Sequence, residues 1–104
     1  MSRTLGIVQP HEEISVAEQI YLIGLHAREE GVEISGFVGS DEILRDEQPA
    51  TRSLLDSIVS GETHSIVFVD AIADKILPDL TRICRECGCK VLVVDRHKAG
   101  LGVA

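Results

Sequence analysis

The residues with the most evident chemical potential follow two apolar stretches of the sequence. Asp70 comes directly after the stretch 63–69, and residues 11–13, with the sequence His-Glu-Glu, follow the shorter stretch 4–8. Open α/β sheets bind ligands beyond the carboxyl ends of their parallel strands. A carboxylate there can accept a phosphoryl group, and a histidine can activate a nucleophile. We therefore expect any functional site at this edge, although a solvated loop is the interpretation we favour for residues 11–13.

Ser15 offers a nucleophilic hydroxyl close to His11 in the sequence. However, Ser15 and Glu18 have the spacing of a capping box, in which each side chain satisfies a backbone N–H of the other residue. Because this role already explains the serine, we interpret Ser15 as the start of a helix.

Three thiols, those of Cys84, Cys87 and Cys89, lie within six residues. A zinc site would need a fourth ligand, for which His64 and His97 are the candidates, and the usual paired spacing is absent. A redox pair is disfavoured because the dipole at a helix C-terminus raises the pKa of a thiol. We therefore predict small buried hydrophobic residues here, and neither a metal nor another cofactor.

Strand-like and helix-like segments alternate along the chain. This order predicts the α/β class, with one mostly parallel sheet of about four strands flanked by helices in the order β-α-β-α-β-α-β. The length of 104 residues indicates one domain, predicted over residues 1–95, with a flexible tail at residues 96–104. Strands are predicted over residues 4–8, 32–38, 64–69 and 90–95, and helices over residues 15–30, 50–60 and 78–87.

The helices should turn apolar faces towards the sheet. The acidic segment 39–49 is too long for an ordinary connection between a strand and a helix, so it is either a partner surface or a mobile loop. The residues expected to face inward are Val16, Ile20, Tyr21, Leu22, Ile23, Leu25 and Ala27 in the first helix, Leu54, Leu55 and Ile58 in the second, and Leu80, Ile83, Cys84 and Cys87 in the third.

The composition argues against two classes of partner. A net charge of -7 repels phosphate backbones, so direct DNA binding is not expected without a basic partner. The sequence has no apolar run of about 18 residues and no basic-then-apolar order at its start, so we expect no membrane contact and a cytoplasmic location.

Five stretches of sequence carry a family resemblance: residues 19–31, the loop that ends in Pro49, residues 52–61, the apolar strand after them and residues 80–92. In their order and spacing they resemble the catalytic domain of the serine recombinases, the resolvase and invertase family. The resemblance covers most of residues 4–95. It implies a resolvase-like sheet and, for a complete family member, DNA strand exchange.

The residues that carry out this chemistry in the family are replaced in the present sequence. Family enzymes attack DNA phosphate with a serine after the first strand, and several arginines stabilise the developing negative charge. Here Gln9 stands where an arginine belongs, and His11 stands where the nucleophile belongs. Gln48 matches the arginine that precedes the loop proline.

The segment after the third strand also lacks its two family arginines. Alignment on Asp70 places Ala71 and Asp74 at these positions. An alignment without a gap from Gly61 instead places Ile72 at the family aspartate, and Ala73 and Ile76 at the two arginines. Both arginines are absent in either alignment. The sequence also ends before the last strand and the long helix with which family members dimerise and grip DNA.

These comparisons leave three hypotheses for function. The first is a catalytically inactive, recombinase-like domain that acts through protein contacts or self-association. The second is an active recombinase module, in which residues other than those named here match the family's catalytic positions. The third is a small-ligand or phosphoacceptor domain that resembles response-regulator receivers, with Asp70 as the acceptor. The third lacks the acid pair after the first strand and a fifth strand with its lysine.

Overall fold

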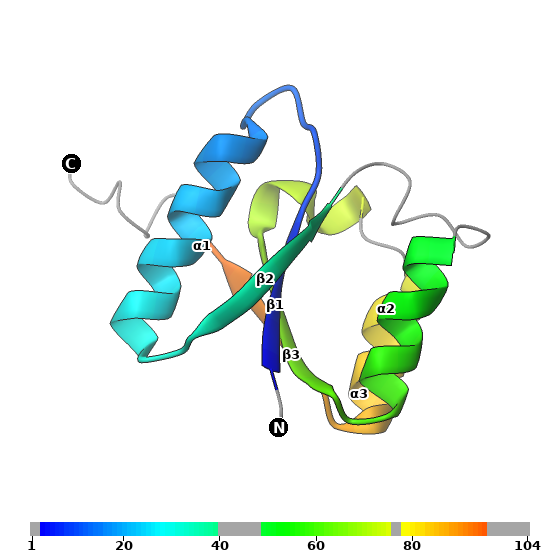
Figure 1. The fold of residues 1–104 in the computed structure, drawn as a ribbon. Helices are drawn as coiled ribbons and strands as arrows, with labels where there is room; N and C mark the ends of the chain where they lie inside the picture. The colour runs from blue at the N-terminus through cyan, green and yellow to red at the C-terminus, as the bar shows by residue number, and fades with distance from the viewer. Residues whose placement is uncertain (1–2, 40–48, 76–77, 96–104) are drawn as a thin grey trace.

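The computed structural model describes residues 3–39, 49–75 and 78–95, and these form one sheet covered by helices on both faces (Figure 1). All strand pairs are parallel, and the strand order is β2-β1-β3-β4. The predicted α/β fold is therefore confirmed, and β1 and β3 are the two central strands. The strands are β1 (Arg3–Val8), β2 (Ile34–Gly39), β3 (Thr63–Val69) and β4 (Lys90–Val94).

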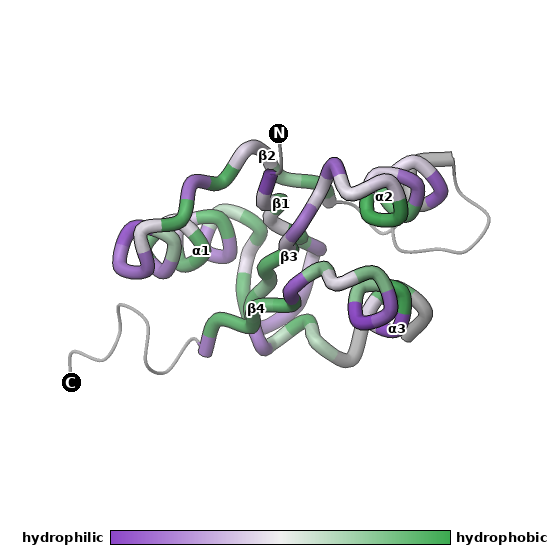
Figure 2. Tube along the Cα trace, turned by 90° about the horizontal axis from the view of Figure 1, so that it is seen from below, coloured by the Kyte–Doolittle hydropathy of each residue, from purple (hydrophilic) through white to green (hydrophobic). Residues whose placement is uncertain are grey.

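The helices lie in two layers. Helix α1 (Val16–Glu30) covers one face of the sheet, whereas α2 (Pro49–Val59) and α3 (Pro78–Cys87) cover the other (Figure 2). A short 3-10 helix, η2 (Asp70–Lys75), follows β3. Pro78 begins α3, as predicted, and its missing N–H costs no hydrogen bond at the first turn of a helix. No helix in the described part of the chain has the length and apolar character needed to cross a membrane.

The start and the end of α1 are each fixed by a cap. The Ser15 Oγ accepts a hydrogen bond from the Glu18 backbone N–H at 3.1 Å, and the Glu18 carboxylate accepts one from the Ser15 N–H at 3.4 Å. Gly31 ends the helix in the left-handed region, at φ 69°, where glycine carries no steric penalty. The capping interpretation of Ser15 is therefore confirmed.

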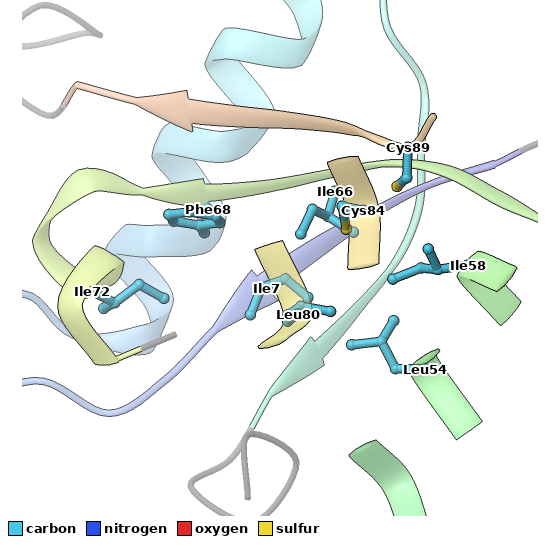
Figure 3. Close-up of a cluster of buried hydrophobic side chains, with 9 residues drawn as sticks. All are labelled: Ile7, Leu54, Ile58, Ile66, Phe68, Ile72, Leu80, Cys84 and Cys89. Atoms are coloured by element: carbon cyan, nitrogen blue, oxygen red, sulfur yellow. The ribbon is translucent and has the colours of Figure 1, made fainter. Parts of the chain in front are cut away.

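Two apolar clusters hold the layers together, one on each face of the sheet. Alternate residues of a strand point to opposite faces. Ile66 and Phe68 accordingly pack with α2 and α3, and Val67 and Val69 pack with α1. The cluster between the sheet, α2 and α3 is drawn in Figure 3 and contains Ile7, Leu54, Ile58, Ile66, Phe68, Ile72, Leu80, Cys84 and Cys89.

Three residues predicted to face inward do not. Ile20 is 39% exposed, Tyr21 is 64% exposed, and Cys87 is also exposed. Successive helical residues turn by about 100°. Tyr21 therefore points away from the buried Ile23, and the fully buried Gln19 occupies the inner stripe instead. Cys87 continues the stripe of Leu80 and Cys84, but it is the last residue of α3 and is exposed at the helix end.

Two other sequence predictions fall on segments that the structure does not describe. The acidic segment 39–49 has only its two end residues within the described ranges, and the tail 96–104 lies wholly outside them. A partner role for the acidic segment and flexibility of the tail remain predictions.

The core predicts a clear stability contrast between two truncations. Ile66→Ala removes a side chain that is 0% exposed in the central strand, so we expect the free energy of unfolding to fall by about 2–5 kcal/mol. Val59→Ala removes a side chain that is 64% exposed on α2, and we expect a change of about 0.5 kcal/mol or less. Urea denaturation followed by circular dichroism measures both. Equal effects of the two variants would contradict this account of the core.

Candidate functional site

The carboxyl edge of the sheet brings together the residues singled out by the sequence. Strands β1 and β3 are parallel neighbours, so the chain leaves both strands at the same edge (Figure 1). Gln9 and His11 follow β1, and Asp70 follows β3. The side chains of all three are partly buried. These three residues therefore lie at one edge of the sheet, and a functional site there remains a prediction.

The path of the chain after β1 is fixed by a buried glutamine on α1. The Gln19 side-chain Oε1 accepts from the Gln9 N–H at 3.0 Å, and its Nε2 donates to the Gln9 carbonyl oxygen at 2.7 Å. The same Nε2 lies 3.3 Å from the carbonyl oxygen of Ile14. Gln19 is 0% exposed, so these bonds replace the water that the backbone of Gln9 would otherwise need.

Sequence reasoning treated Gln19 only as part of the family resemblance and missed this structural role. The available signal was a lone amide on the apolar stripe of α1, one turn before Ile23. The Gln9 side chain itself has a buried Oε1 without a hydrogen-bond partner among the described residues. Gln9 therefore contributes its backbone to the structure and leaves an acceptor oxygen at the edge.

The histidine and the serine near this edge have local partners. The His11 Nδ1 accepts a hydrogen bond from the Glu13 backbone N–H at 3.1 Å. An accepting Nδ1 carries no proton, so the neutral ring has its proton on Nε2. The Ser15 Oγ donates to the Glu18 carboxylate at 3.2 Å while it caps α1. The serine hydroxyl is thus engaged within its own helix start and is not activated by His11.

The arginines of the described segments are placed away from this edge or along the outer surface. Arg3 begins β1 and lies 3.6 Å from Glu62, and Arg28 and Arg85 lie in the last turns of α1 and α3. These positions belong to the opposite, amino edge of the sheet. On the outer surface, Arg82 pairs with Glu86 at 3.7 Å, and Arg52 lines a groove of about 530 Å³ with Arg3 and Glu62.

The residues after β3 mainly anchor the turn. Ile72 is fully buried in the cluster beneath α2 and α3, and the partly buried Ala71 packs against the cluster beneath α1. Ala73 is exposed. The side chain of Asp74 and the whole of Gln48 and Ile76 lie outside the described residues. Apolar contacts are therefore made by Ala71, which the first alignment places at a family arginine. They are also made by Ile72, which the second alignment places at the family aspartate.

The cysteines separate into a buried pair and an exposed residue. Cys84 and Cys89 are 0% and 6% exposed, and the Cys84 thiol donates a hydrogen bond to the Cys89 sulfur. Burial, with smaller effects from Cys89, raises the pKa of Cys84 to about 12. Within the ranges that the structure describes, no three metal-binding side chains form a group. The prediction of small buried residues is confirmed for Cys84 and Cys89 and is wrong for Cys87.

Comparison with known proteins identifies the fold. No protein-family model matches the chain, and no curated protein matches its sequence. Among solved structures, the C-terminal catalytic domain of ISC1926 TnpA, an IS607-like serine recombinase, is 13% identical with a TM-score of 0.68. That match covers 89% of this chain and 70% of the other.

A second solved structure, the first open reading frame of transposon ISC1904 from Sulfolobus solfataricus P2, is also 13% identical. Its TM-score is 0.65, and the match covers 89% of this chain and 67% of the other. At this level of identity the similarity concerns the fold. The chain therefore has a serine recombinase-like fold, as the resemblance implied.

The Gln19 bonds predict opposite outcomes for two substitutions. Gln19→Leu keeps the volume but leaves the N–H and the carbonyl of Gln9 without their partner, so we expect a loss of about 2 kcal/mol or more in unfolding free energy. Gln9→Ala removes only a side chain whose buried oxygen has no partner among the described residues, and we expect a neutral or slightly stabilising effect. Urea denaturation distinguishes them. A larger loss for Gln9→Ala than for Gln19→Leu would contradict this assignment.

The buried thiol of Cys84 predicts that the protein becomes less stable at alkaline pH. Because the pKa of Cys84 is about 12 when folded and 9.0 ordinarily, the unfolded chain loses this proton first as the pH rises. The contribution of Cys84 to the free energy of unfolding is thus intact below about pH 9. Above that pH it falls by at most about 1.4 kcal/mol per pH unit. Between about pH 8 and 10.5 the free energy of unfolding should decline less steeply with pH in Cys84→Ala than in the native chain. In Cys87→Ala it should decline as steeply as in the native chain. The same slope in both variants would refute the role of Cys84.

Proposed function

On the basis of this serine recombinase-like fold, we propose that the chain is a catalytically inactive recombinase-like domain that acts through contacts with other protein molecules, including copies of itself. The observation that carries the proposal is the composition of the carboxyl edge. After β1 it presents Gln9 and His11, and the nearby Ser15 hydroxyl is committed to a helix cap. No free nucleophilic hydroxyl is provided by these residues.

The number of catalytic groups that are replaced supports catalytic inactivity. Attack on a phosphodiester produces negative charge that must be stabilised in the transition state, and each lost contact of this kind costs about 2.7–4 kcal/mol. The described arginines lie at the opposite edge or on the outer surface of the helices. Small rearrangements of the edge cannot replace several such cations together with the nucleophile.

The charge of the chain favours protein partners over nucleic acid. A net charge of -7 opposes the approach of DNA, whose binding depends on neutralising phosphates and releasing counterions. A fold that has lost its chemistry still offers surfaces for association. We therefore expect DNA to be reached, if at all, through a basic partner.

A cleavage assay tests the absence of chemistry directly. Purified protein is incubated with supercoiled plasmid, with and without magnesium, and an IS607-like serine recombinase with its own site is the positive control. We expect neither nicked plasmid nor a covalent protein–DNA adduct above background. An adduct that forms with the native chain and disappears in Ser15→Ala would overturn the proposal and support an active module instead.

A further inference from the structure

Two of the three thiols lie together in a way that their spacing in the sequence does not suggest. Cys84 and Cys89 are the most widely spaced of the three cysteines, yet the Cys84 thiol donates a hydrogen bond to the Cys89 sulfur. Both side chains belong to the buried cluster beneath α2 and α3 (Figure 3). Cys87, which lies between them in the sequence, is exposed at the end of α3.

The backbone holds this pair within reach of a covalent bond. Gly88 has a left-handed conformation, at φ 76°, and turns the chain back after α3. The Cys89 N–H then donates to the Cys84 carbonyl oxygen at 2.7 Å. With standard backbone dimensions, this bond keeps the two Cα atoms within about 6.6 Å of each other. Disulfides usually span Cα separations of about 4.4–6.8 Å. Because the two sulfur atoms are also in contact, the pair can be bridged without a large movement of the backbone.

We propose that Cys84 and Cys89 are a site of oxidative modification, at which hydrogen peroxide converts the two thiols to a disulfide and leaves Cys87 unpaired. A hollow of about 490 Å³ beside β4 gives a small oxidant access to the pair, and Cys89 lines this hollow together with Phe68 and Arg85. Cys84 is 0% exposed, whereas Cys89 is 6% exposed. We therefore expect the oxidant to reach Cys89 first.

The reaction has two steps, and its products are the disulfide and two water molecules. The Cys89 sulfur attacks one oxygen of the peroxide, the O–O bond breaks, and the thiol proton leaves with the other oxygen as water. The Cys84 sulfur then attacks the sulfur of the resulting sulfenic acid, so that the S–S bond forms and the S–O bond breaks. The departing hydroxide takes the Cys84 proton. The two thiols lose two electrons in total, and the peroxide gains them.

The surroundings of the pair determine the rate and the selectivity of this reaction. Burial raises the pKa of both thiols, so little thiolate is present at neutral pH and the first step is slow. The hydrogen bond from Cys84 acts in the opposite sense on Cys89, because it stabilises negative charge on the accepting sulfur. Selectivity comes from the contact between the two residues. A sulfenic acid at Cys89 already has the Cys84 sulfur beside it, whereas Cys87 is exposed at the helix end.

Peptide mapping of the full chain tests the pairing. The folded protein is treated with hydrogen peroxide, its remaining free thiols are alkylated, and it is digested with trypsin. Trypsin cuts after Arg85, between Cys84 and the other two cysteines. A Cys84–Cys89 disulfide therefore joins two tryptic peptides, and tandem mass spectrometry should find the alkyl group on Cys87. Reduction with dithiothreitol should separate the two peptides again.

Two single substitutions give a matched comparison. Cys87→Ala keeps the pair, so its intact mass should fall by two hydrogen atoms on oxidation, as for the native chain. Cys89→Ala keeps Cys84 and Cys87, and we expect it to lose the intramolecular disulfide completely. Circular dichroism checks the fold of both variants. If Cys89→Ala does not fold, the map of the native chain decides the question alone.

The result is independent of the proposed function. Any map of the native chain without the Cys84–Cys89 bridge would overturn the inference, whether Cys87 is bridged instead, the thiols stay free, or they are oxidised to sulfinic acid. Catalytic inactivity is judged by the DNA cleavage assay, which concerns the carboxyl edge of the sheet. Cys89 directly precedes β4, so the cysteine pair lies at the opposite edge.

Discussion

The burial of β3 on both faces is the constraint on which the rest of the structure depends. Its backbone pairs with β1 on one side and β4 on the other, and its side chains alternate between two apolar clusters. Ile66 and Phe68 hold one helical layer, and Val67 and Val69 hold the other. None of these contacts involves the polar residues at the end of the strand. The fold can therefore persist when the residues at its carboxyl edge change.

The connection from β1 to α1 shows how specific the remaining polar contacts are. One buried group must give a hydrogen bond to the Gln9 carbonyl and accept one from the Gln9 N–H. An amide supplies both functions without a charge, whereas arginine and lysine have no acceptor and a carboxylate has no donor. Gln19 is thus suited to a position that is completely buried. It stabilises the shape of the edge and does not supply reactive chemistry.

The sequence was sufficient for those features that depend on local patterns. The alternation of apolar runs predicted all four strands, the Ser15–Glu18 spacing predicted the start of α1, and Pro78 predicted the start of α3. It was insufficient where the result depends on which part of a helix meets the sheet. Tyr21 and Cys87 are apolar enough for burial, but the angular position of Tyr21 turns it outward and Cys87 lies at the exposed end of α3. The role of Gln19 depends on a backbone ten residues away, which no local pattern reveals.

Helix α1 therefore has different functions on its two sides. Its inner side fixes the exit of β1 through Gln19 and closes one apolar cluster through Leu22 and Ile23. Its outer side is free of these duties, so the fold sets no requirement on Tyr21 or Gly24. Substitutions on the outer side can therefore change the surface of the protein without disturbing the exit of β1 or the apolar cluster.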